Sequence, residues 1–181
     1  GAHHLPRSGS AIVLANHSSF LDSIILELCP QRLICFMTKN TQYGGWLMNW
    51  ILNNAGAFPV RRYTTDVTAV RTVMRLVAAG HLVGIFPEGE RCWDGEMLPF
   101  KRGTIRLVAA LGCPIVPVGI SGAYALMPRW THRINSVPLT VTFDAPFYLP
   151  QIPIAHQREE DIARAGAQIR ERIMARFGLM L

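Results

Sequence analysis

Acidic residues are absent from two long stretches of this 181-residue sequence, residues 28–65 and 97–143. Charged residues make up only 17% of the chain, yet its formal net charge is +6 and nearly all of its cations are arginines. Arginine is preferred where a planar, forked donor must hold phosphate or carboxylate groups. We therefore expect an anionic partner, namely a phosphate ester, a nucleic acid or an anionic membrane. The acid-free stretches carry Lys39, Arg61, Arg62, Lys101, Arg102, Arg106, Arg129 and Arg133.

The sequence also lacks paired cysteines, an apolar leader region and an uninterrupted membrane-spanning run. Its four cysteines show neither a CxxC pair nor close Cys/His spacing, so we expect reduced thiols in a cytoplasmic setting and no metal site. The uncharged run 107–128 is long enough to span a bilayer, but its Gly and Pro residues exclude a single helix there. The cysteines are Cys29, Cys35, Cys92 and Cys113.

Half of the residues are hydrophobic, which excludes a disordered chain and supports a sizeable core. Because no linker, internal repeat or low-complexity tract interrupts the sequence, we interpret residues 1–181 as a single domain. The chain begins at Gly1 and reaches strand residues almost at once, which leaves open a preceding, membrane-associating segment that has been removed.

Short apolar runs that fit buried strands alternate with stretches of helical periodicity. This alternation predicts an α/β fold with a mostly parallel central sheet and helices on both of its faces. Trp46 and Trp50 share one face of an expected helix; we favour core packing, with a helix lying in a membrane surface as the alternative. Strands are expected at 11–15, 32–38, 56–62, 81–86, 114–120 and 137–143, and helices at 24–28, 43–52, 66–79, 104–111 and 159–177.

The turn at residues 16–22, between the first expected strand and helix, carries a candidate general base. It follows the carboxyl end of a strand, where open α/β sheets bind their ligands. We expect His17 to precede the helix and turn back towards Asp22, because a carboxylate that accepts from one imidazole nitrogen leaves the other as a base. The same residues also fit a structural capping box with Ser19 as N-cap and Asp22 three residues later.

Two more expected strand ends carry polar clusters, Arg61 with Arg62 and the segment Glu88-Gly89-Glu90-Arg91. The carboxyl ends of parallel strands lie on one edge of a sheet, so both clusters can converge with His17. Each cluster alone is a weak signal, whereas their order along the chain is specific.

Together these motifs resemble the blocks of the glycerolipid acyltransferases of the 1-acylglycerol-3-phosphate acyltransferase family. Four blocks match in order, and a Phe-Lys-x-Gly element lies between the last two, which argues against chance and favours catalysis over capping. Glu90 stands where that family usually has Thr, and Arg61 where an acid is common; both departures concern substrate preference. The blocks are Asn16–Asp22, Gly56–Arg62, Phe86–Arg91 and Pro114–Ile120, with Phe100–Gly103 between the last two.

The resemblance implies a glycerolipid acyltransferase-like fold and transfer of a fatty acyl group from a thioester to the hydroxyl of a lysophospholipid. The foremost acceptor is 1-acylglycerol-3-phosphate, and acyl-CoA or acyl carrier protein is the co-substrate, with no further cofactor. His17 is then the base and Asp22 its orienting partner, while the backbone N–H groups of Ser18 and Ser19 are available to the oxyanion. The implied acceptor and phosphate ligands are Arg62, Arg61, Glu88, Gly89, Arg91 and Lys101.

We expect a peripheral protein on the cytoplasmic face of the cell membrane, at an anionic lipid surface. Acceptors that remain open are another lysophospholipid or an amino-acid lipid. From another class, a non-catalytic domain that binds anionic lipid remains an alternative. Nucleic-acid binding is disfavoured, because the aromatic residues near Arg61 fit an apolar acyl path better than base stacking.

Overall fold

The central element of the computed structural model is a six-stranded sheet with strand order β3-β2-β4-β1-β5-β6. Neighbouring strands pair in parallel, except that β5 and β6 are antiparallel. The predicted mostly parallel sheet is confirmed. The strands are β1 (Ala11–Ala15), β2 (Ile34–Lys39), β3 (Phe58–Val60), β4 (Leu82–Ile85), β5 (Ile115–Ser121) and β6 (Thr140–Phe143). The structure describes residues 1–29, 32–39, 44–46, 49–50, 56–60, 66–131 and 133–177.

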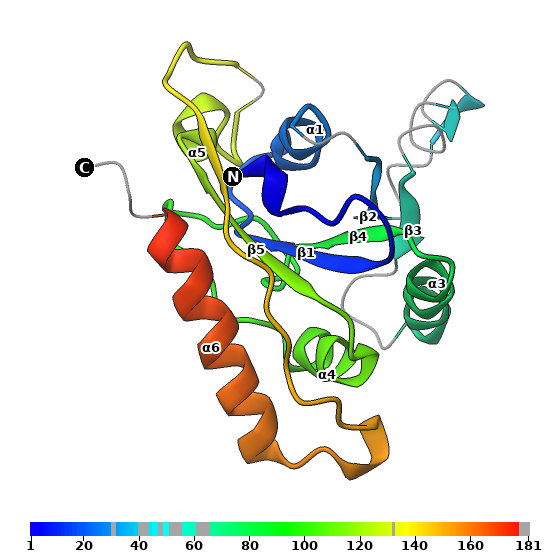
Figure 1. Cartoon of the computed structure of the whole chain (residues 1–181). Helices are drawn as coiled ribbons and strands as arrows, with labels where there is room; N and C mark the ends of the chain where they lie inside the picture. Colours follow the sequence, from blue (N-terminus) through cyan, green and yellow to red (C-terminus); the bar gives the residue numbers. More distant parts are fainter. Residues whose placement is uncertain are drawn as a thin grey trace.

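Helices cover both faces of this sheet, as the sequence predicts. On one face lie α1 (Asp22–Glu27) and α5 (Ala123–Leu126); on the other lie α3 (Val67–Ala78), α4 (Arg102–Leu111) and α6 (Glu159–Phe177) (Figure 1). Two short 3-10 turns, η1 (Ala2–His4) and η3 (Ile154–His156), complete the described elements.

Strand β1 is buried along its full length because both of its faces are covered. Its Ile12 and Leu14 belong to the core cluster shared with α3, α4 and α6, whereas Val13 belongs to the cluster shared with α1. A continuous apolar run is the sequence pattern of such a doubly covered strand. The loop after β1 therefore starts from the most firmly packed part of the molecule.

The bounds of the long helices agree closely with the prediction, but the apolar face of α3 is only partly buried. Helix α6 buries Ile162, Ile169 and Ile173 as expected. In α3, helical periodicity places Val67 and Met74 on one apolar face with Val70, Val73 and Val77, yet Val67 and Met74 are 52% and 50% exposed. The physical reason is that α3 contacts β3 and β4 through a narrow stripe of the helix, in which Ala69 and Val73 are buried.

The predicted core packing of Trp46 and Trp50 is wrong, because these side chains are 82% and 62% exposed. Parts of the predicted 43–52 helix lie outside the described residues, as do Arg61 and Arg62 of the predicted 56–62 strand. Across the described ranges, no helix combines the length and apolar character that crossing a bilayer requires.

Candidate active site

His17 lies in the loop between β1 and α1, at the carboxyl edge of the parallel strands. Its Nδ1 is 2.8 Å from Asp22 Oδ2, and both residues are buried. An ionised carboxylate only accepts hydrogen bonds, so Nδ1 carries the proton and Nε2 is the basic nitrogen of the neutral ring. The predicted contact between His17 and Asp22 is confirmed, and its geometry suits a general base.

The Asp22 carboxylate also organises the turn before it. Asp22 Oδ2 accepts hydrogen bonds from the backbone N–H groups of Ser18 and Ser19, at 2.7 and 2.8 Å. The prediction that these two N–H groups are available to an oxyanion is therefore wrong, since the carboxylate at the start of α1 reaches back and occupies both. The capping box is found in part: the N-cap of α1 is Leu21, not Ser19, but Ser19 N donates to Asp22 Oδ2 at 2.8 Å and Ser19 Oγ accepts from Leu21 N at 3.3 Å.

Glu88 joins the loop after β4 to the loop after β1. Its Oε1 accepts from the backbone N–H of His17 and its Oε2 from that of Leu98, both at 2.7 Å, and only 1% of the residue is exposed. Burial raises the pKa of Glu88 to about 7, because desolvation outweighs the two backbone hydrogen bonds that favour the carboxylate. The prediction that Glu88 contacts the acceptor is corrected: its carboxylate holds two loops together beneath the surface.

Gly89 provides the space that Lys101 needs to cross this loop. Gly89 has a φ of +74°, and a Cβ there would lie 3.0 Å from Lys101 Cγ. A side chain at this position would thus be strained in conformation and crowded by Lys101. The Lys101 side chain is 56% exposed and its Nζ lies 3.8 Å from Glu90 Oε1. Lys101 and Gly89 are therefore neighbours, and the space at Gly89 accommodates the Lys101 side chain; their contact with the acceptor stays a prediction.

The other predicted phosphate ligands are only partly placed by the structure. Arg91 is half-buried in the same loop, and its carbonyl oxygen accepts a 2.7 Å hydrogen bond from Arg129 Nη1. Arg61 and Arg62 lie outside the described residues, so their convergence with His17 stays a prediction.

Two contributors to the site were missed by sequence reasoning, Asn16 and Phe86. The Asn16 side chain donates to Ile120 O at 3.0 Å and accepts from Ile120 N at 2.7 Å, which ties the end of β1 to β5. The Phe86 ring stacks on the His17 ring, with centroids 4.1 Å apart and planes at 14°. Their positions directly after β1 and β4 were the available signal, since such residues line the same sheet edge.

No group of three or more His, Cys, Asp or Glu side chains that could hold a metal ion occurs within the part of the chain that the structure describes. Around His17, Asp22 bonds the imidazole and two backbone N–H groups, and Glu88 bonds the backbone of His17. The arrangement is thus a buried His–carboxylate pair braced by two loops, which can accept and return a proton.

Comparison with known proteins identifies the group of sequences to which these motifs are similar. Residues 1–121 match the family model described as Acyltransferase. The chain is 32% identical over 152 residues to 1-acyl-sn-glycerol-3-phosphate acyltransferase BAT2, chloroplastic, of Brassica napus, covering 82% of the chain and 44% of that protein. It is 30% identical over 183 residues to 1-acyl-sn-glycerol-3-phosphate acyltransferase alpha of Bos taurus, covering 98% of the chain and 61% of that protein.

A solved structure has the same fold. The crystal structure of the 1-acyl-sn-glycerophosphate (LPA) acyltransferase PlsC from Thermotoga maritima superposes with a TM-score of 0.78 at 25% identity, covering 97% of this chain and 68% of that one. The chain spans only about half of the length of the Brassica napus and Bos taurus relatives, at 44% and 61%. The similarity extends over the sheet, the helices and the loops that carry the site.

Proposed function

The chain belongs to the acyltransferase family whose model matches residues 1–121, and on that premise we propose that it acylates the free hydroxyl of a lysophospholipid, foremost 1-acylglycerol-3-phosphate. The names of its relatives support this acceptor, which would be converted to phosphatidic acid. The observation that carries the chemistry is the 2.8 Å contact between His17 Nδ1 and Asp22 Oδ2 at the sheet edge.

In the proposed mechanism, His17 Nε2 removes the proton of the acceptor hydroxyl as its oxygen attacks the thioester carbonyl carbon. A hydroxyl is a poor nucleophile at neutral pH, so this proton transfer lowers the barrier. The new C–O bond forms, the C–S bond breaks, and the proton on His17 passes to the departing thiolate. No covalent bond to the protein is formed. Asp22 favours the imidazolium that exists between the two proton transfers.

The loops around His17 support this role by fixing the imidazole. Asp22 is itself held by two backbone N–H groups, and the backbone of His17 is held by Glu88. The Phe86 ring covers one face of the imidazole. A base whose ring cannot rotate loses less entropy when it engages the substrate, which is how positioning raises the rate.

The donor in this proposal is a fatty acyl thioester, either acyl-CoA or acyl-loaded acyl carrier protein, and no other cofactor takes part. Arg62 is proposed to hold the acceptor phosphate through a charge-assisted fork. The alternative acceptors are another lysophospholipid or an amino-acid lipid, in which case Arg62 would bind a different headgroup.

We further propose peripheral attachment to an anionic membrane on its cytoplasmic face. Ile24 on α1 and the flanking residues Phe20 and Leu28 are 50%, 48% and 81% exposed. Trp46 and Trp50 are exposed as well, and tryptophan favours the boundary between water and lipid. The net charge of +6 would favour the negative cytoplasmic leaflet. Because Phe20 lies three residues after His17, such a contact would bring a lipid hydroxyl close to the base.

A panel of lysophospholipids, each offered with acyl-CoA and with acyl carrier protein as donor, tests this function. We expect product of the mass of phosphatidic acid from 1-acylglycerol-3-phosphate, with release of one thiol per product. Preference for another lysolipid would identify the alternative acceptor. Lipid binding without product from any pair would instead support the non-catalytic binding domain.

A further inference from the structure

Glu90 bridges two cations at the surface of the site. Its Oε1 lies 3.8 Å from Lys101 Nζ, and its Oε2 accepts a 3.1 Å hydrogen bond from Arg129 Nη1. Lys101 precedes α4 and Arg129 follows α5, so that two distant segments present positive charge to one carboxylate. The two oxygens of the Glu90 carboxylate thus occupy the space between the Lys101 and Arg129 side chains.

The segments that carry this cluster are bonded to the loop of the candidate base. The loop that carries Glu90 bonds to the base loop on both sides, through Glu88 and through a 2.9 Å hydrogen bond from Cys92 N to His17 O. The segment that carries Arg129 also contacts the base loop, since Ser19 Oγ donates to Met127 O at 3.1 Å. A group bound between the two cations would therefore sit close to the reacting hydroxyl.

Arg129 is held in place independently of Glu90, whereas Lys101 is not. The Arg129 guanidinium lies 3.7 Å from the centroid of the Trp93 ring and also donates to Arg91 O at 2.7 Å. Its side chain is 21% exposed, compared with 56% for Lys101. Arg129 is thus a preorganised, partly desolvated cation, and Lys101 is a flexible one that can follow a ligand.

We propose that Lys101 and Arg129 bind a phosphate group of the substrate, and that Glu90 is the internal counterion which this phosphate displaces. The inference rests on the proposed acyltransferase function and concerns the headgroup of its substrate. The two cations and Glu90 together carry one positive charge, and displacement of Glu90 exposes two. A dianionic phosphate monoester gains more from the two exposed cations than a monoanionic diester does, so the cation pair favours monoesters, while competition with Glu90 lowers the affinity for both.

Two substrates carry such a phosphate, the acceptor 1-acylglycerol-3-phosphate and the coenzyme A portion of a donor. Direct titration with glycerol 3-phosphate, and separately with coenzyme A, shows which of them the cluster holds. These titrations need no turnover. They are run on the full chain and on the variants Glu90→Gln, Arg129→Gln and Lys101→Gln.

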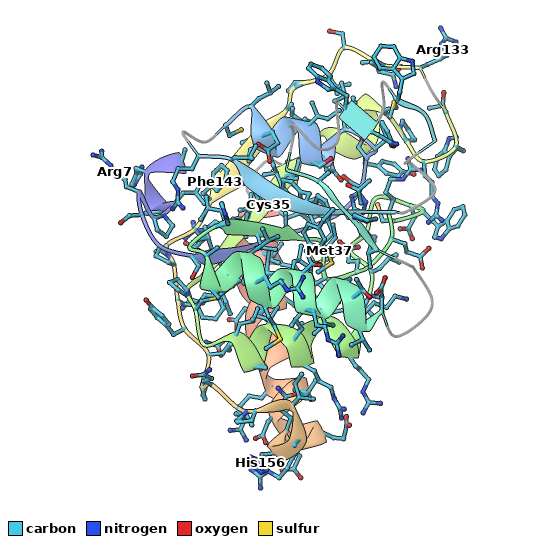
Figure 2. The ribbon with its side chains drawn as sticks, turned by 90° about the vertical axis from the view of Figure 1, so that its right-hand side faces the viewer. Arg7, Cys35, Met37, Arg133, Phe143 and His156 are labelled. Atoms are coloured by element: carbon cyan, nitrogen blue, oxygen red, sulfur yellow. The ribbon has the colours of Figure 1, made fainter. Side chains whose placement is uncertain are left out.

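We expect Glu90→Gln to tighten binding of one of these probes by about threefold to tenfold, and Arg129→Gln to weaken it by a similar factor. The double variant Glu90→Gln/Arg129→Gln should lose the gain, since Glu90 acts by competing for that arginine. Matched controls are Glu96→Gln in the same loop and Arg133→Gln, which removes a cation that projects from the outer part of the molecule (Figure 2). Both controls should stay within about twofold of the unmodified protein.

The alternative is that the pair of Glu90 and Arg129 only fastens two loops. In that case both variants lower the melting temperature, and Glu90→Gln tightens neither probe, which would overturn the proposal. Product formation is measured on the same samples. If the unmodified protein forms product but the variants bind both probes as it does, only the phosphate-binding role of the cluster is contradicted. If the variants show the expected binding shifts but no acceptor gives product, the proposed acyltransferase function is contradicted.

Discussion

The backbone N–H of His17 donates a 2.7 Å hydrogen bond to Glu88 Oε1. The two residues are 71 positions apart in the sequence, yet they follow the adjacent parallel strands β1 and β4. The second oxygen of Glu88 accepts from Leu98 N, also at 2.7 Å. The buried Glu88 carboxyl group thus fixes the backbone of His17, while Asp22 fixes its imidazole ring.

This burial predicts how stability depends on pH. The pKa of Glu88 is raised from 4.5 to about 7, so the folded protein holds this proton more tightly than the unfolded chain does. The resulting stabilisation is present below about pH 4.5 and is lost as the pH rises through about 7. Burial also raises the pKa of Glu27 to about 7, which acts in the same direction. We therefore expect the free energy of unfolding, measured by urea titration, to decrease between pH 5 and pH 8 as Glu88 and Glu27 ionise.

Glu88→Gln should flatten that decrease, because it removes one of the two titrating groups. It should also cost about 1–3 kcal/mol above pH 7, where Glu88 is a carboxylate that accepts both backbone hydrogen bonds and an amide cannot. The exposed Glu96, in the same loop region, provides the control Glu96→Gln with an unchanged pH profile. An equally steep profile in Glu88→Gln and in the unmodified protein would show that Glu88 does not titrate in this range.

Much of this fold follows from local sequence patterns, and the site does so only in part. The run from Ala11 to Ala15 is apolar throughout and too short for a typical helix, which favours a buried strand, and Gly112 ends α4 in the left-handed conformation that glycine favours. The contact of His17 with Asp22 was predictable because both lie within one turn. The hydrogen bonds of Glu88 were not, since they depend on which strands are neighbours in the sheet.

Spacing along a helix also fails to say what a side chain faces. Trp46 and Trp50 have the i, i+4 spacing of a core stripe, yet both are exposed. The same pattern also fits a helix on a membrane surface, so spacing alone does not choose between the two. The roles of Ser18 and Ser19 were misjudged for a different reason. Their N–H groups are near a candidate oxyanion position in sequence, but a carboxylate from the following helix occupies both.

A prediction about the acceptor phosphate separates Arg62 from Arg61. Arg62 stands at the arginine position of the family motif, and successive side chains of a strand point to opposite faces, so one of the two should contact the acceptor. Arg62→Ala should cost about 1.5–3 kcal/mol of binding, seen as a raised KM for the lysophospholipid with little change in the donor KM. Arg62→Lys should recover only part of the loss, because an ammonium lacks the fork. If Arg61→Ala raises the acceptor KM and Arg62→Ala does not, the assignment is reversed.

A prediction about membrane contact concerns the exposed aromatic residues and the net charge. Binding to anionic vesicles should weaken as salt increases, because exposed charges are screened. Trp46→Ser and Trp50→Ser should each weaken it further at every salt concentration, whereas the control Tyr148→Ser, an exposed aromatic residue near β6, should not. Sedimentation with neutral and anionic vesicles measures both effects. Equal, salt-independent binding to the two vesicle types would contradict the electrostatic part.

The central claim is that His17 is the general base of an acyl transfer, and the turnover of His17→Ala tests it most directly. The variant is compared with the unmodified protein by the mass of the product formed from 1-acylglycerol-3-phosphate and an acyl thioester, at matched circular dichroism and melting temperature. We predict that kcat falls by roughly 10²–10⁴-fold while the fold is retained. Turnover of a folded His17→Ala variant within a few-fold of the unmodified protein would contradict the account.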